Sequence, residues 1–324
     1  MVDKTQVFAS GVSDHFRNRL THSLEVAQIS HSVAAALGLN ETLAETLALV
    51  HDIGHPPFAH AGEEELNRQM QRFGETFDHN QHGLRIVEQF ESRYARFPGL
   101  NLTFEVREGI VKHSRDYAPG EILAFDEYLP GLRPPLEAQL IDLCDEIAYN
   151  TADLDDAYSA GLAPINALRQ AVPEFDRLWM LIETQFPAAP ERVRMHEVVR
   201  ALISELVVGL IEGTVAAAAH LNDVEAVRSA SVRVCQFSQP AHRTDLELKQ
   251  FLRMHVYESE QLIEDRRRST ARIADLFAYF LSRPEALPAG YQDAMRDQSA
   301  PRVICDYIAG MTDGFLNRTW LQLS

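Results

Sequence analysis

Histidine is concentrated near the start of this 324-residue sequence, where eight of the thirteen histidines lie between His15 and His82. Neutral imidazole is the commonest transition-metal ligand in proteins and the usual acid–base group near pH 7. The concentration therefore predicts a site for metal binding, proton transfer or both. Three short segments carry these histidines: Arg19-Leu-Thr-His22, His51-Asp52-Ile-Gly-His55-Pro-Pro-Phe-Ala-His60 and Asp78-His79-Asn80-Gln81-His82.

His51 and Asp52 follow an apolar segment, 41–50, whose spacing is helical. Adjacent side chains on an α-helix diverge by about 100°, so both reach one ion only if it lies beside the helix end. Gly54 and Pro56 end the helix at that point. An isolated His-Asp pair is more often a hydrophilic helix end, but further histidines on either side favour a metal site: His22, His31, His55, His60 and His79.

Two other groups of residues share a helix face. Arg19 and His22 are three positions apart, so one can bind a metal while the other binds an anion, although a lone histidine is more often a partly buried one with a polar partner. Asp145, Tyr149 and Asp153 form a polar stripe on an otherwise apolar helix. Buried carboxylates are costly without a metal or donor, whereas nearby acidic residues equally suggest a solvated face: Asp142, Glu146, Asp155 and Asp156.

Two histidines and two aspartates would form a mixed nitrogen and oxygen donor set. Such a set suits Mn²⁺, Fe²⁺, Co²⁺, Ni²⁺, Mg²⁺ or Zn²⁺ better than a metal that prefers thiolates. An ion of this kind lowers the pKa of bound water and polarises a phosphoryl oxygen. The residue types therefore favour metal-assisted hydrolysis of a phosphate ester.

The elements that position these residues are predicted to be helices throughout. Apolar residues recur at three- and four-residue spacing, alternating runs are nearly absent apart from 232–237, and about a dozen helices fit the turn signals. Segment 116–135, rich in Pro, Gly and acidic residues, is predicted to be a surface loop or a lid. We expect a helical core over 1–160 and a helical extension over 161–324, which form one structural unit.

Composition excludes several classes of protein. With 30 Lys and Arg against 47 Asp and Glu, the net charge is −17, which disfavours a general nucleic-acid binder. Cys144, Cys235 and Cys305 form neither a disulfide framework nor a zinc motif. The sequence contains no run of about 18 apolar residues and does not start with a signal peptide. We therefore expect a cytoplasmic protein that does not span a membrane.

The order His22, His51-Asp52, Asp145 resembles the H…HD…D signature of HD-domain metal-dependent phosphohydrolases. Longer blocks across nearly the whole sequence resemble the bacterial deoxyguanosine triphosphate triphosphohydrolase (dGTPase) family. These blocks are Lys4-Thr-Gln-Val-Phe8, Arg19–Gln28, His51–Glu63, Phe77–Gln81, Gly99–Thr103, Asp145–Asn150 and Asp306–Asp313.

The resemblance implies an all-α HD-domain fold and a reaction that splits a dNTP, dGTP or several dNTPs, into deoxynucleoside and inorganic triphosphate. Metal-activated water would attack the α-phosphorus. The implied metal ligands are His22, His51, Asp52 and Asp145, and the ion would be Mn²⁺, Mg²⁺, Ni²⁺, Co²⁺ or Fe²⁺. The resemblance also implies a homo-oligomer, with a hexamer favoured.

The same resemblance assigns the remaining site residues. His60, Glu63 and His79 match a catalytic group, in which His79 or His60 donates a proton to the departing 5′ oxygen and Glu63 orients it. The substrate-binding residues would be His55, Arg19 and Lys249 at the phosphates, and Tyr149, Asp153 and Tyr257 at the sugar and base. Tyr307 and Asp313 are placed less securely and are interpreted as structural.

Departures from the family pattern leave base preference and activation by a second nucleotide open. Only Val2 and Asp3 follow Met1 before the first block, Glu258-Ser259 follows Tyr257, and Gly314 follows Asp313. One alternative is an HD phosphohydrolase acting on nucleoside monophosphates or cyclic nucleotides. Another is a non-catalytic nucleotide sensor or weak single-stranded nucleic-acid binder, for which 266–268 is the only basic run.

Overall fold

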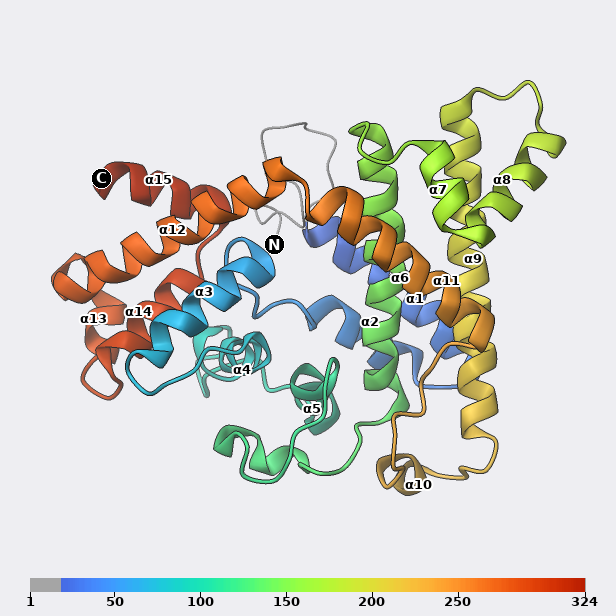
Figure 1. The fold of residues 1–324 in the computed structure, drawn as a ribbon. Helices are drawn as coiled ribbons and strands as arrows, with labels where there is room; N and C mark the ends of the chain where they lie inside the picture. The colour runs from blue at the N-terminus through green and yellow to red at the C-terminus, as the bar shows by residue number, and fades with distance from the viewer. Residues whose placement is uncertain (1–18, 324) are drawn as a thin grey trace. The chain divides into compact units, whose positions relative to one another are not determined.

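A computed structural model describes residues 19–323, and in that range it contains fifteen α-helices and no β-strand (Figure 1). The prediction of an all-α fold is confirmed. The block at 4–8 lies outside the described residues.

The helices are α1 (Arg19–Leu37), α2 (Glu41–Val50), α3 (Ala59–Gln71), α4 (His79–Arg85), α5 (Phe104–Lys112), α6 (Leu136–Ser159), α7 (Ile165–Ala171), α8 (Pro173–Gln185), α9 (Glu191–Ala218), α10 (Val224–Arg228), α11 (Gln239–Leu252), α12 (Glu260–Ser282), α13 (Ala289–Ala294), α14 (Ala300–Ala309) and α15 (Asp313–Leu323).

Four short helical turns join these helices: η1 (Ile86–Phe90), η2 (Leu123–Tyr128), η3 (Arg253–Tyr257) and η4 (Pro284–Ala286). The chain forms two compact units that interleave along the sequence. The first unit contains 19–21, 50–103 and 261–323 of the described residues, and the second contains 22–49 and 104–260.

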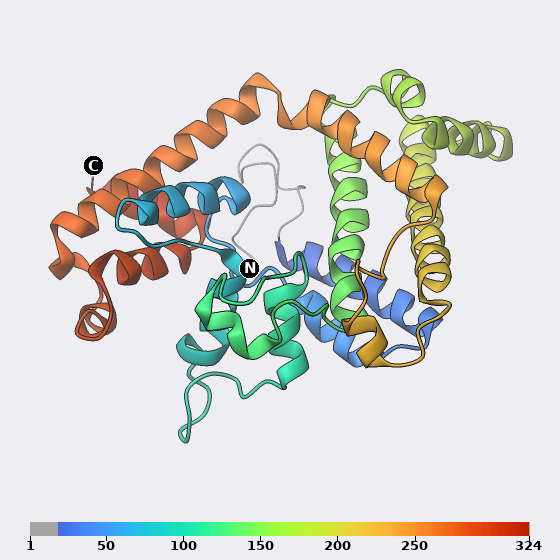
Figure 2. The ribbon, with the colours of Figure 1, turned by 60° about the horizontal axis from the view of Figure 1, so that its bottom comes forward.

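The core of the first unit joins α3 to the C-terminal helices α12, α14 and α15. Figure 2 shows α3 beside α12 and α14. Apolar side chains separated by about 200 positions in sequence pack together here: Leu66, Met70, Phe77, Ile273, Leu276, Phe277, Phe280, Ile304, Ile308 and Leu316 are all buried. This packing fixes α3, which carries His60 and Glu63 near its start.

The second unit is built around the long helices α6 and α9. Helix α11 packs against both of them, and α8 packs against α9 (Figure 1). By length and composition α9 is apolar enough to cross a membrane. Its Leu202, Leu206 and Leu210 are buried in this bundle, and 33% of its most apolar window is buried in all.

Segment 116–135 lies mostly at the surface, as predicted, but it is anchored rather than loosely attached. Tyr117, Phe125 and Tyr128 are buried, and η2 gives the segment helical structure of its own. These contacts do not fit a lid that swings on a hinge.

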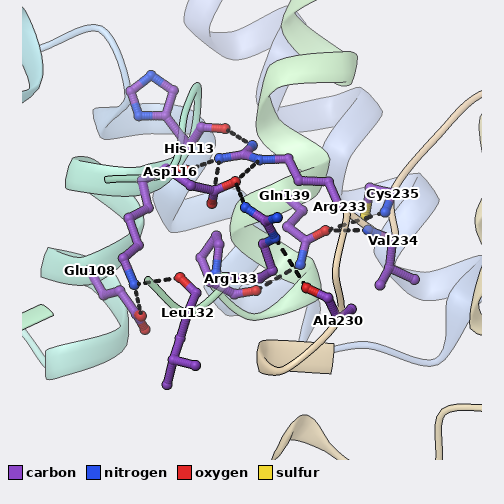
Figure 3. Close-up of polar contacts among 12 residues, drawn as sticks. Glu108, His113, Asp116, Leu132, Arg133, Gln139, Ala230, Arg233, Val234 and Cys235 are labelled. Carbon is purple, nitrogen blue, oxygen red and sulfur yellow. Dashed lines mark hydrogen bonds and ion pairs between the residues drawn. The ribbon is translucent and has the colours of Figure 1, made fainter. Parts of the chain in front are cut away.

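A buried polar network completes the anchoring (Figure 3). Asp116 lies between two guanidinium groups, at 2.6 Å from Arg133 and 3.3 Å from Arg233. The guanidinium of Arg233 also donates to the backbone oxygens of residues 112 and 113 at 2.6 Å. Below it, Glu108 pairs with Lys112 at 3.0 Å and with Arg228 at 2.6 Å. The network ties α5, the segment and residues 228–235 to one another.

Candidate active site

His51 and Asp52 lie at the end of α2, as the sequence predicted. The Asn40 side chain caps α2 by accepting from the amide of Leu43 at 3.0 Å. The carboxylate of Asp52 then lies between two imidazoles, with Oδ1 at 3.5 Å from His51 Nε2 and at 2.9 Å from His55 Nδ1. One carboxylate and two imidazoles therefore lie together just after the end of α2.

The surroundings lower the pKa of both Asp52 and His55, so both groups are deprotonated at neutral pH. Burial alone would raise the pKa of Asp52, but His55, His51 and Arg19 hold it well below its usual value. Burial lowers the pKa of His55 to about 3, although Asp52 opposes this shift. At neutral pH the site therefore contains an ionised carboxylate beside a neutral imidazole, which are the forms that bind a cation and donate a hydrogen bond.

Gly54 allows the turn after His51-Asp52 to lie directly on α4. A Cβ atom at this position would be 1.9 Å from the backbone oxygen of His79 and 2.4 Å from the amide nitrogen of Gly83. No larger residue fits without moving the backbone. The close approach brings the second and third histidine segments together, 51–60 and 78–82.

Glu63 connects His60 and His79, the three residues predicted to be catalytic. Its Oε1 accepts a hydrogen bond from the backbone amide of His79 at 2.8 Å and lies 2.8 Å from His79 Nδ1. Its Oε2 lies 3.6 Å from Nδ1 of the largely exposed His60. The imidazole of His55 stacks on that of His79 with centroids 3.9 Å apart.

The protonation states of this cluster suit proton transfer. Burial would raise the pKa of Glu63, but hydrogen bonds from His60 and His79 lower it strongly. The Glu63 carboxylate in turn raises the pKa of His60. Ligand atoms of His55, His60 and Glu63 lie within 4.8 Å of one another, so the same three residues could hold a cation. A protonated imidazole that is stabilised by a carboxylate can act as a general acid.

In the second unit, His22 and Asp145 form a close pair. His22 Nε2 lies 2.7 Å from Asp145 Oδ1, and the His22 side chain is almost fully buried. They come from α1 and α6, at positions 123 residues apart in sequence. Arg19, one helical turn before His22, is also buried, and its Nε and Nη1 atoms have no hydrogen-bond partner within 19–323. Unpaired guanidinium donors fit the predicted anion contact.

The predicted sugar pocket residues also meet in the second unit. Tyr257, in η3, donates a hydrogen bond from its hydroxyl to Asp153 Oδ2 on α6. Burial and then acidic neighbours raise the pKa of both Tyr149 and Tyr257, so both hydroxyls stay protonated. Asp153 is buried, which argues against a solvated acidic face at this position.

Lys249 has two acidic partners that the sequence did not single out as site residues. Its Nζ lies 2.6 Å from Glu146 Oε1 and 2.9 Å from Asp245 Oδ2. Burial raises the pKa of Glu146 to about 7, although Lys249 opposes the shift. Glu146 was noticed only as part of an acidic face. Asp245 was not singled out, although it lies four positions before Lys249 on α11, a spacing that could have indicated the pair.

Two aspartates of the C-terminal helices contact the histidine segments within the first unit. Asp306 pairs with Arg85 of α4 and lies 3.6 Å from His82 Nδ1. Asp313 Oδ1 accepts from the backbone amide of Phe58 at 3.1 Å. Tyr307 packs edge-on against Phe280.

Comparison with known proteins identifies the family. Residues 19–150 match the HD domain, and residues 235–322 match the phosphohydrolase-associated domain. A deoxyguanosinetriphosphate triphosphohydrolase-like protein of Geobacter sulfurreducens is 42% identical over 315 residues, which cover 96% of this chain and 81% of the relative. A relative of the same name from Azoarcus sp. (strain BH72) is 44% identical over 317 residues, covering 96% and 82%. The chain belongs to the deoxyguanosinetriphosphate triphosphohydrolase-like family.

The two matched domains contain most of the predicted site residues. Those from Arg19 to Tyr149 lie in the HD domain, Lys249, Tyr257 and Asp313 lie in the phosphohydrolase-associated domain, and Asp153 lies between the two matched ranges. An HD domain is that of a metal-dependent phosphohydrolase, and the chain carries histidine and aspartate groups that could bind a metal. The dGTPase-like protein is therefore a phosphohydrolase.

Proposed function

We propose that this dGTPase-like protein is a metal-dependent triphosphohydrolase that splits dGTP or several dNTPs into deoxynucleoside and inorganic triphosphate. The observation that carries the proposal is the cluster of Glu63 with His60 and His79, close to His55 and the ionised Asp52. Such a cluster supplies a proton donor for a leaving oxygen next to a cation-binding carboxylate.

We propose that His22, His51, Asp52 and Asp145 bind the metal ion. The donor set fits a divalent cation, because it combines two imidazoles with carboxylates and Asp52 remains ionised at neutral pH. When bound, the ion lowers the pKa of water and stabilises charge on the phosphoryl oxygens. The imidazoles suit Ni²⁺, Co²⁺ and Fe²⁺ and the carboxylates suit Mn²⁺ and Mg²⁺, so all five ions are candidates.

In the proposed reaction, water attacks the α-phosphorus and the bond from that phosphorus to the 5′ oxygen breaks. The attacking oxygen stays on the triphosphate, and the 5′ oxygen takes a proton from His79 or His60. Glu63 holds the imidazole of His79 in one tautomer through the 2.8 Å contact to Nδ1, which leaves Nε2 for the substrate.

We propose that Arg19, His55 and Lys249 bind the triphosphate. Arg19 would do so through its unpaired donors, and His55 as a neutral hydrogen-bond donor, because its pKa is about 3. Lys249 would have to exchange Glu146 and Asp245 for phosphate oxygens. Tyr149, Asp153 and Tyr257 would bind the sugar and base. The Tyr257 hydroxyl donates to Asp153, and this hydrogen bond would hold the Tyr257 ring beside the ribose 2′ position.

The test is product analysis with each dNTP and NTP in the presence of Mn²⁺ or Mg²⁺. The proposal expects intact triphosphate and nucleoside in equal amounts. Release of orthophosphate or pyrophosphate, or turnover only of monophosphates or cyclic nucleotides, would contradict it. Binding of single strands without turnover would instead favour a sensor, although Arg267 and Arg268 are both paired with Glu264 at 2.9 Å.

A matched pair of double variants links the activity to the proposed ligands. His51→Ala with Asp52→Ala should abolish triphosphate release. His31→Ala with Glu45→Ala removes a similar pair, 3.6 Å apart, whose side chains are half exposed, and should leave the rate within about twofold. Equal rates in both double variants would exclude the ligand assignment.

We also propose that the protein acts in the cytoplasm as a homo-oligomer, with a hexamer favoured by the family resemblance. Its three cysteines are free and buried, which suits a reducing compartment. Light scattering coupled to size-exclusion chromatography measures the oligomeric state directly, and a monomeric mass under assay conditions would contradict the proposal.

A further inference from the structure

The turn between His55 and His60 has a strained backbone. Phe58 and Ala59 have φ values of +63° and +52°, in the left-handed region that residues with a Cβ atom rarely adopt. They are consecutive, and α3 starts at the second of them. Strain of this kind persists only where surrounding structure imposes it, and it is typical of functional sites.

Two contacts from the C-terminal part of the chain hold Phe58 in this conformation. The buried Asp313 carboxylate accepts the Phe58 amide hydrogen bond at 3.1 Å. The Phe58 ring packs against the apolar core of the first unit, so glycine could not replace it without losing that packing. Thr312 supplies the cap of α15 through the amide of Phe315 at 3.1 Å, and Asp313 is thereby directed to the turn.

The other side of the turn has no space into which it could relax. Gly62 lies so close to the Pro57 carbonyl that a Cβ atom would be 1.9 Å from its oxygen. The turn therefore sits against the first turn of α3, with Asp313 on its amide. A change in the turn would move His60, which directly follows Ala59, and His55, which precedes Pro56.

We propose that Asp313 is a positioning residue that holds the Phe58–Ala59 turn in its left-handed conformation and so sets His55 and His60 relative to Glu63. This role rests on the proposed hydrolysis, in which Glu63 and its histidine partners move the proton. Asp313 does not touch the substrate in this proposal. It acts through the backbone of a segment 255 residues earlier in sequence.

The first measurement does not depend on activity. Hydrogen–deuterium exchange of peptides that contain the Phe58 amide should accelerate at least about tenfold in Asp313→Ala, because the amide loses its acceptor. Asp313→Asn keeps an acceptor oxygen and should stay close to the wild type. Asp293→Ala removes an exposed aspartate paired with Arg296 at 3.0 Å and serves as the control.

The second measurement is the rate with the nucleotide that the wild type hydrolyses fastest. Asp313→Ala should lower kcat about 10- to 100-fold with little change in KM, since a displacement of about 1 Å of a catalytic group has an effect of this size. Asp313→Asn should recover most of the rate. Adding Ala59→Gly to Asp313→Ala should restore part of it, because glycine adopts positive φ without strain.

The outcomes separate the two proposals. Unchanged exchange at Phe58 in Asp313→Ala contradicts the role of Asp313, and so does faster exchange with an unchanged kcat. Loss of rate that neither Asp313→Asn nor Ala59→Gly restores, together with a lowered Tm, indicates a general loss of structure and also contradicts it. A wild-type protein that hydrolyses no nucleotide contradicts the proposed function instead, and the exchange of the Phe58 amide still tests the hydrogen bond.

Discussion

Glu63 has the contacts of an orienting carboxylate rather than those of a surface acid. One oxygen binds both the backbone amide and the ring of His79, and the other lies near His60. The adjacent Glu64 is exposed. Glu63 and Glu64 are successive residues of α3 with different surroundings. Variants of the two therefore separate the effect of the histidine contacts of Glu63 from the effect of losing one negative charge in this region.

Glu63→Gln should lower kcat at least about 100-fold with a small change in KM, because an amide stabilises a protonated imidazole far less than a carboxylate does. Glu64→Gln should stay within about twofold of the wild type. Steady-state kinetics of both variants at pH 7 makes the comparison. A loss of rate in both variants of similar size would point to a general effect of charge.

Glu146 makes a pH-dependent contribution to stability. Its pKa is about 7 in the folded protein against 4.5 for an unperturbed glutamate, so the folded state holds this proton more tightly than the unfolded chain. The contribution is complete below pH 4.5 and is lost as the pH rises through 7. Glu146→Gln cannot ionise at this position. Relative to this variant, the free energy of unfolding of the wild type should fall by up to about 3 kcal/mol between pH 4.5 and 8.

Urea unfolding at several pH values tests this expectation. Glu212→Gln, at an exposed position of α9, provides the control and should show no such difference from the wild type. If the free energies of unfolding of Glu146→Gln and the wild type run parallel across this range, the burial of Glu146 has no such effect.

Some contacts between near neighbours could be expected from the sequence. His51 and Asp52 follow an apolar helical segment, and His60 and Glu63 are three positions apart at a helix start, although the role of this second pair was implied by the family resemblance. Glu146, which pairs with Lys249, and Phe58, whose amide binds Asp313, could not be found in this way, because they lie in distant segments and no periodicity relates them. The strained turn at Phe58 carried no signal at all, since neither of its residues is a glycine.

Among the elements, those with strong apolar periodicity were predicted well. The helix ending at His51 and the helix carrying Asp145, Tyr149 and Asp153 both exist as α2 and α6. The prediction for segment 116–135, a surface loop or a lid, was only partly right. Its composition indicated the surface, but its attachment depends on Asp116 meeting Arg133 and Arg233, whose positions span 117 residues. Ion pairs between distant segments leave no pattern in the sequence.

The packing of the His51-Asp52 turn on α4 depends on Gly54. Gly54→Ala should lower the free energy of unfolding by about 3 kcal/mol or more, because its Cβ would meet backbone atoms of His79 and Gly83 that cannot move separately. Gly290→Ala, in α13, meets nothing within 4 Å and should be neutral or stabilising by up to about 1 kcal/mol. Thermal unfolding measures both, and equal Tm changes would contradict the close packing at Gly54.

At the scale of the whole molecule, a net charge of −17 does not prevent binding of a triphosphate. The charge argues against broad contact with a polyanion, whereas in the proposed function a nucleotide would experience the local field of Arg19, Lys249 and a bound cation. Two of the acidic residues, Asp52 and Glu63, would serve the proposed metal site and proton transfer.

Metal removal should affect both activity and stability. Chelation followed by dialysis should abolish triphosphate release and lower Tm, and a cation at about 100 times its Kd should add about 2.7 kcal/mol of stability. Calorimetric titration should give one ion per chain for the proposed ligands. Two ions per chain would indicate that His55, His60 and Glu63, whose ligand atoms lie within 4.8 Å, form a second site, and unchanged Tm and activity would contradict metal dependence.

The interleaving of the two units has a consequence for synthesis on the ribosome. Leu66, Met70 and Phe77 are synthesised before their packing partners, which lie in 273–316. The second unit needs only 22–49 and 104–260, so its residues are all synthesised before those partners. The core of the first unit can therefore form only after 273–316 have left the ribosome, and until then these three apolar side chains are without their native partners.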